Sequence, residues 1–185
     1  MRCIDATDVK KWAETSGIQF DHSLSLSKAA SSKGVEIFPN ESKCQLLGLA
    51  RMMVEWFPPS LEKLLVISES TSYPPDKDVI IRRIRGMSDN VADVGVMPGT
   101  IIRATRVSGE DYERRNGDDI DEESALLWLS YFTMLFAWSG DLVARASVKH
   151  VHFGDGFCAF RSDTYEHIGE VKEFAASAGL RVREL

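Results

Sequence analysis

The sequence has few cysteines and no long hydrophobic run. Its 185 residues include three cysteines, Cys3, Cys44 and Cys158, which are too few and too widely spaced for a disulfide framework. The longest largely apolar stretch, Ala125–Trp138, has 14 residues, whereas a membrane-spanning helix needs about 20. The first ten residues lack the apolar segment of a signal peptide. We therefore expect a cytoplasmic protein without membrane contact.

The common catalytic and nucleotide-binding motifs are also absent. The sequence contains no P-loop, no G-x-S-x-G elbow, no H-E-x-x-H pair and no C-x-x-C pair. Gly154–Ala159 does spell G-x-G-x-x-A, but a dinucleotide fingerprint must open a helix, and this segment is aromatic and apolar. We interpret it as a hairpin turn, and we expect no cofactor.

Length and hydrophobic periodicity predict one α+β domain over residues 1–185. Helices are expected at Ala6–Ser16, between Asn40 and Pro58, at Asp78–Arg85, at Ser124–Trp138, and from an N-cap at Asp163 to Gly179. Strands are expected at Ile18–Phe20, Gly34–Phe38, Leu64–Ile67, Thr100–Val107, Leu142–Phe153, Phe157–Phe160 and Leu180–Leu185. The predicted fold is a mixed β-sheet covered by about five helices, with a C-terminal hairpin–helix–strand unit.

Two stretches of this prediction have less regular patterns. Ser23–Lys33 has many serines and no apolar period, so we expect a loop there. In Leu142–Phe153, the apolar residues change from one face to the other near Lys149. Either a bulge lies near Lys149, or the covered face of the sheet changes at that point.

Three of the four histidines, His150, His152 and His167, lie within a short part of the chain. Residues two apart on a strand point to the same face, so His150 and His152 are expected to present two imidazoles to one side. A third ligand could come from His167, Glu170, Asp155 or Cys158, and with His167 the set would form a site for zinc or another first-row transition metal. An H-x-H pair alone lacks the full ligand count, so hydrogen-bonded histidines at the rim of the sheet are the favoured interpretation.

The excess negative charge of the chain comes from one segment. The chain has 22 basic and 28 acidic residues, which gives a net charge of −6. Glu110–Glu123 has eight acidic and two basic residues and accounts for all of that excess. Its last three acids fit the first turn of a helix, where the helix dipole favours negative charge. The earlier acids have two interpretations, a solvated loop or a partner-binding surface. The candidate partner-binding residues are Glu110, Asp111, Glu113, Asp118 and Asp119.

These features lead to three hypotheses about function. The first is a non-catalytic protein-binding domain, of inhibitor, immunity or adaptor type, whose acidic segment steers a partner with a basic surface. The overall negative charge argues against nucleic acid as a partner. The second is a small metal-dependent enzyme built on His150, His152 and His167. The third is a structural homo-oligomer that buries the aromatic side chains of Ser124–Trp138.

Overall fold

The computed structural model describes residues 1–21, 24, 26–28, 33–40, 42–67, 75–87, 97–103, 121–154 and 156–185. Within these ranges the chain forms an eight-stranded sheet, a separate two-stranded sheet and five helices. The predicted α+β class is therefore confirmed. The strand pairs described in the large sheet are antiparallel, whereas the sequence predicts a mixed sheet.

Short strands lie side by side in the large sheet, and the central ones are buried on both faces. In spatial order they are β1 (Arg2–Ile4), β6 (Gly99–Ile102), β5 (Lys63–Ile67), β7 (Gly140–Ala144), β8 (His150–Gly154), β9 (Phe157–Arg161), β4 (Gly34–Phe38) and β10 (Arg181–Glu184). The small sheet pairs β2 (Gln19–Phe20) with β3 (Leu26–Lys28). The N- and C-terminal strands thus form the two opposite edges of the large sheet.

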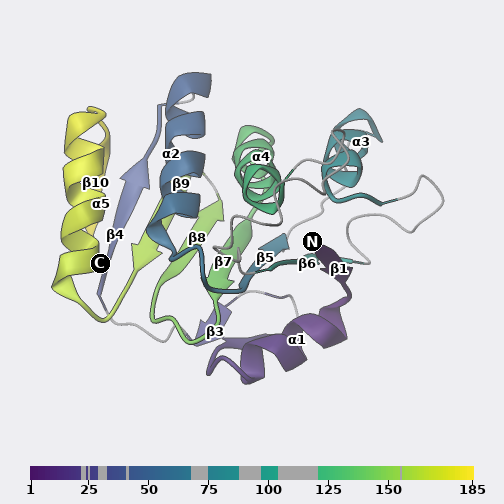
Figure 1. The fold of residues 1–185 in the computed structure, drawn as a ribbon. Helices are drawn as coiled ribbons and strands as arrows, with labels where there is room; N and C mark the ends of the chain where they lie inside the picture. Colours follow the sequence, from purple (N-terminus) through teal and green to yellow (C-terminus); the bar gives the residue numbers. More distant parts are fainter. Residues whose placement is uncertain are drawn as a thin grey trace, which may run out of the picture.

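Helices cover the two faces of the sheet unequally, as Figure 1 shows. One face carries a helical layer, which consists of α2 (Lys43–Trp56), α3 (Pro75–Ile84), α4 (Glu122–Leu135) and α5 (Tyr165–Ser177). The other face is covered in part by α1 (Ala6–Glu14), with β3 nearby. The larger core lies under the helical layer, and Leu126, Leu142 and Val151 belong to it. A second core joins α1 to the sheet through Val9, Trp12 and Val143.

Several local predictions need correction. The expected loop at 23–33 contains β3, which pairs with β2. The helix expected after Asn40 has its N-cap at Ser42, and the helix expected from Asp163 has its N-cap at Thr164. Neither cap residue makes a side-chain cap hydrogen bond. Residue types that favour a cap thus located these helices to within two residues but did not fix their first turns.

The predicted hairpin is confirmed, but the long strand before it is wrong. β8 and β9 pair antiparallel, with Val151 opposite Phe160 and Phe153 opposite Cys158. Residues 142–153 form two strands, because the chain turns after Ala144 and β7 pairs with β8. Ala146 has a φ of 53° in this turn, a conformation that is rare for a residue other than glycine. The change in apolar parity near Lys149 therefore reflects a turn and not a bulge.

Replacing glycine by alanine is predicted to have opposite effects at Gly156, in the β8–β9 turn, and at Gly169, in α5. Gly156 has a φ of 80°, and an added Cβ would meet no atom within 4 Å. Gly156→Ala should therefore destabilise the protein by about 1 kcal/mol through backbone strain alone. Gly169 lies in α5 with equally open space, so Gly169→Ala should stabilise it by about 0.5–1 kcal/mol. Urea unfolding measures both changes, and effects of the same sign would contradict the described turn.

Candidate functional site

A buried carboxylate and two imidazoles lie on the face of the sheet opposite the helical layer. Asp141 on β7 pairs in register with His152 on β8, and Leu142 pairs with Val151. Leu142 and Val151 belong to the core under the helices. Because residues of a strand alternate between faces, Asp141, His150 and His152 point to the α1 side. The expectation that both histidines point one way is therefore confirmed.

The two imidazoles share one carboxylate oxygen. Oδ1 of Asp141 lies 2.8 Å from Nε2 of His150 and 3.0 Å from Nδ1 of His152. The Asp141 side chain is completely buried and that of His150 almost so, whereas the His152 side chain is 34% exposed. Oδ2 of Asp141 and Nδ1 of His150 are buried polar atoms without a hydrogen-bond partner. We call these three residues the Asp141 cluster.

Two opposing effects determine whether the Asp141 carboxyl group is ionised. Burial alone would raise the pKa of Asp141, but the hydrogen bonds from His150 and His152, together with their electrostatic attraction, outweigh it and hold this pKa below its ordinary value. The carboxylate is therefore ionised at neutral pH and can only accept hydrogen bonds. Consequently, His150 donates through Nε2–H and His152 donates through Nδ1–H.

His167 belongs to a different part of the structure. It lies on α5, in the helical layer, where its Nδ1 is 2.8 Å from the hydroxyl oxygen of Ser162. Its carbonyl accepts a hydrogen bond from the indole of Trp56 at 3.3 Å. The structure thus brings His150 and His152 together and places His167 on the other face of the sheet. In the described part of the chain, no group of three or more His, Cys, Asp and Glu side chains is placed to hold a metal ion.

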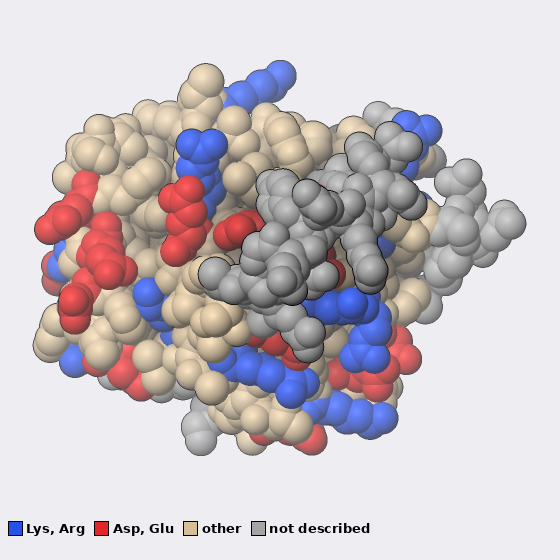
Figure 2. Space-filling model, viewed as in Figure 1, with Lys and Arg blue, Asp and Glu red and all other residues tan. Residues whose placement is uncertain are grey.

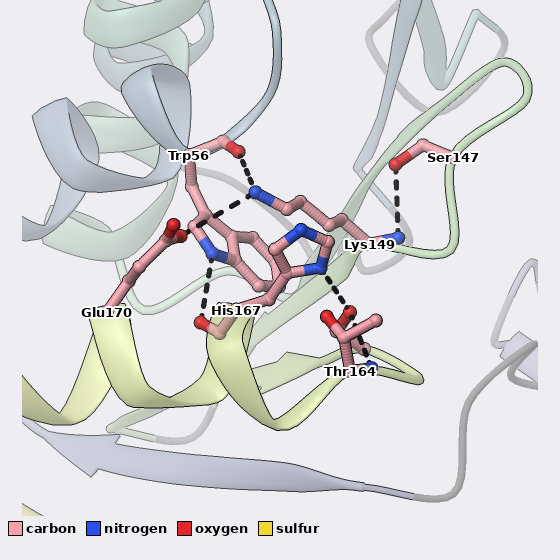
Figure 3. Close-up of polar contacts among 7 residues, drawn as sticks. Trp56, Ser147, Lys149, Thr164, His167 and Glu170 are labelled. Atoms are coloured by element: carbon pink, nitrogen blue, oxygen red, sulfur yellow. Dashed lines mark hydrogen bonds and ion pairs between the residues drawn. The ribbon is translucent and has the colours of Figure 1, made fainter.

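Lys149 lies at the C-terminal end of α2, near His167. No motif in the sequence identified it as a candidate site residue. Its ammonium group donates to the carbonyl oxygen of Trp56 at 2.7 Å and lies 3.7 Å from the Glu170 carboxylate. Figure 3 shows the lysine passing alongside the Trp56 ring toward both groups. Burial lowers the pKa of Lys149, and Glu170 partly opposes that effect. A cation at the C-terminal end of α2 is favoured by the helix dipole, so this arrangement has a structural explanation.

A second candidate site is the uncharged side of α4. No charged residue occurs between Ser124 and Gly140. Trp128 stacks on Phe132 with ring centroids 5.8 Å apart, and Phe132 stacks on Phe136 at 5.6 Å. We call Trp128, Phe132 and Phe136 the aromatic row. Trp128 is 39% exposed, although the helix contributes Leu126 and Leu129 to the core.

The start of α4 explains the last acids of the acidic segment. The Asp121 side chain caps the helix by accepting from the amides of Glu123 and Ser124. Glu122 accepts from the amide of Arg103 at 2.6 Å and pairs with the N-terminal amine. The prediction that the last three acids occupy the first helical turn is confirmed for Glu122 and Glu123, whereas Asp121 is the N-cap residue just before that turn. The predicted partner-binding residues lie outside the described residues: Glu110, Asp111, Glu113, Asp118 and Asp119.

Figure 2 shows basic and acidic side chains interspersed over the middle and lower parts of the visible face, whereas the upper part has few charged side chains. Acidic side chains gather over α5 at the left of that view.

In the described residues, no helix has the length and apolar character that a membrane crossing requires. The three cysteines are unpaired, and burial raises the pKa of the Cys158 thiol to about 12, which leaves it inert as a nucleophile.

Comparison with known proteins finds no relative of this chain. No protein-family model matches it, and neither the curated proteins nor the solved structures contain a match. The functional interpretation therefore depends on the residues and geometry described above.

The Asp141 cluster predicts a specific dependence of stability on pH. Because the pKa of Asp141 is lowered on folding, the ionised carboxylate stabilises the protein above its unfolded pKa, near 4. That stabilisation should disappear as the pH falls below about 4. Asp141→Asn should therefore lower the free energy of unfolding by roughly 3 kcal/mol at pH 7, and the difference from wild type should shrink in acid.

Urea unfolding of both proteins between pH 7 and pH 2.5 measures this difference. Asp163→Asn removes an exposed carboxylate and serves as the control, with an expected change within about 0.5 kcal/mol. A difference between wild type and Asp141→Asn that stays constant down to pH 2.5 would show that the Asp141 charge does not stabilise the fold.

Proposed function

We propose that the protein binds another protein through the aromatic row of α4, together with the acidic segment that leads into this helix. The partner has a basic surface next to an apolar patch. An inhibitor, an immunity-type protein and an adaptor are the kinds of function that fit such binding. The cytoplasm remains the predicted compartment.

The observation that carries this proposal is the absence of charged residues on α4 after its first turn. A surface helix normally has polar and charged residues on the side away from the core. After its first turn, α4 instead has apolar residues on its partly exposed side, and Trp128 is 39% exposed. Tryptophan is among the residues that most often dominate binding energy at protein interfaces. Trp128 is therefore the expected centre of the contact.

Charge favours a different protein over a second copy of this chain. Residues 110–123 carry a net charge of −6 and lead directly into α4. Two copies that met through α4 would bring two such segments close together, and their repulsion would oppose association. A basic partner would instead be attracted. This argument separates the proposal from the structural homo-oligomer that the aromatic helix also suggests.

Site-specific cross-linking in the native cells tests the position of the contact. A photoreactive phenylalanine derivative replaces Trp128 in one variant and Val148 in the control, because these residues are 39% and 38% exposed. Position 128 should cross-link to another polypeptide with excess basic residues, and position 148 should not. Trp128→Ala should then weaken binding of that purified polypeptide by about 10-fold or more, as expected for an interface hot spot.

Two results would contradict the proposed contact. One is cross-linking from position 128 only to a second copy of the chain. The other is a captured polypeptide whose affinity is the same for wild type and Trp128→Ala.

Association kinetics with the captured partner test the role of the acidic segment. Asp118→Asn combined with Asp119→Asn should slow association at low salt, because charges at the edge of an interface act mainly on the on-rate. At roughly 1 M salt, where the Debye length is about 3 Å, the variant should behave like wild type. Glu166→Gln with Glu173→Gln makes the same change in net charge on α5 and should slow association less. Equal slowing by both double variants would mean that only the overall charge matters.

A further inference from the structure

In the described residues, the core between α1 and the sheet stops at β7. This core contains residues of β1, β6, β5 and β7, and none of β8, β9, β4 or β10. Cys158 of β9 and Ile37 of β4 point to the helical layer, so the residues that alternate with them point to the opposite face. They include Phe157 and Phe38, which are partly exposed. We call the part of this face formed by β8, β9, β4 and β10 the open face.

A band of aromatic and basic side chains crosses the open face from strand to strand. The rings of His152 on β8, Phe157 on β9 and Phe38 on β4 follow one another, with centroids 5.8 Å and 6.3 Å apart. Arg181 and Arg183 of β10 continue the band, with guanidinium carbons 4.6 Å and 5.4 Å from the centre of the Phe38 ring. Four neighbouring strands thus contribute to one band.

Protection of the sheet edge explains only part of this band. Charged residues on an edge strand such as β10 hinder pairing with other chains. Phe38 and Phe157, however, lie on the inner strands β4 and β9. Residues on the solvated face of an antiparallel sheet are normally polar, so aromatic rings there require another explanation. RNA-binding sheets use partly exposed aromatic rings on neighbouring strands, with basic side chains beside them, to stack bases.

Charge on the open face is locally positive. Arg161 points to the same side as Phe157, because both alternate with residues of the core under the helices. Arg181 and Arg183 lie on that side as well, since they contact the Phe38 ring. On these four strands the acid with this orientation is Glu36, which pairs with Arg183. The Arg183 side chain is still 66% exposed, so a ligand could reach its guanidinium group.

The acidic segment joins the described structure at the other edge of the sheet. Residues 110–123 account for the whole net charge of −6, so the remaining chain is neutral overall. At the end of this segment, Glu122 accepts from the amide of Arg103 beside β6 and pairs with the N-terminal amine beside β1. β10 forms the opposite edge. The argument from net charge against nucleic acid therefore does not apply to the open face.

We propose that the open face binds single-stranded nucleic acid, with successive bases stacked on Phe157 and Phe38. Arg161 and Arg181 pair with the adjacent phosphates, and Arg181 exchanges its contact with the Phe38 ring for a phosphate. Every base has a face that can stack on an aromatic ring, and guanidinium groups bind phosphate oxygens, so this binding needs no particular sequence. In a duplex the base faces are covered by their neighbours. This site does not depend on the aromatic row of α4, which belongs to the helical layer on the other side of the sheet.

Fluorescence anisotropy of a labelled single-stranded RNA of about ten nucleotides tests the proposal. Phe157→Leu should weaken binding by about 5-fold or more, because one stacking ring is lost. Trp128→Leu is the matched control, since it removes an exposed aromatic side chain of α4 and should leave the affinity unchanged. A duplex of the same sequence should bind more weakly than the single strand, and circular dichroism checks that each variant is folded. Absence of binding to wild type, or equal affinity of wild type and folded Phe157→Leu, would overturn the proposal.

Salt dependence of the same binding tests the phosphate contacts. Arg161→Gln with Arg181→Gln should lower the slope of log affinity against log salt concentration by about 1.4, since each phosphate contact of a single strand contributes about 0.7. Lys43→Gln with Arg51→Gln makes the same change in net charge on α2 and should alter the slope less. Equal changes in the two double variants would overturn the proposal.

Competition by an oligoglutamate peptide distinguishes nucleic acid from an acidic protein as the occupant. The peptide has negative charge but no ring to stack, so it should displace the RNA poorly, and Phe157→Leu should not alter its affinity. Displacement of the RNA by the peptide at equal concentration, with both affinities unchanged in Phe157→Leu, would assign the open face to acidic protein segments and overturn the proposal.

Discussion

Packing of α4 against α2 and the middle of the sheet is the interaction on which the rest of the structure depends. Leu126 and Leu129 of α4 are fully buried in the larger core. Tyr131 of the same helix packs with Leu46 and Ala50 of α2. The apolar character of α4 continues beyond these contacts to its outer side. The same residue pattern that completes the core therefore also leaves Trp128 at the surface, where a partner could bury it.

Polar groups inside the sheet are arranged differently on its two faces. On the helix-covered face, Lys149 donates a hydrogen bond to the Trp56 carbonyl at the end of α2 and forms an ion pair with Glu170. It thereby links the β7–β8 turn to two helices. On the opposite face, Asp141 depends on two histidines and keeps an unpaired oxygen. The first arrangement is explained by helix-end electrostatics. The second joins β7 to β8 through one buried carboxylate oxygen.

Local signals in the sequence were sufficient for the helices and for the β8–β9 hairpin. Glycines at 154 and 156 between apolar runs indicated that hairpin, and β8 pairs antiparallel with β9. No glycine or proline marks the turn after Ala144 in the sequence. The residue with a positive φ in this turn is an alanine, Ala146. Without that turn, neither the β7–β8 register nor the contact of Asp141 with His152 could be predicted. The grouping of His167 with the other two histidines was wrong because sequence proximity does not show which face of the sheet a helix covers.

Trp128 is the most direct reporter of the central claim that α4 is an interface. The other three tryptophans, Trp12, Trp56 and Trp138, are buried, so iodide should quench mainly the fluorescence of Trp128. The measurement is iodide quenching of the isolated protein and of its complex with the cross-linked partner. The account predicts a quenchable fraction in the isolated protein that is lost in the complex. A fraction that remains equally quenchable in the complex would contradict it.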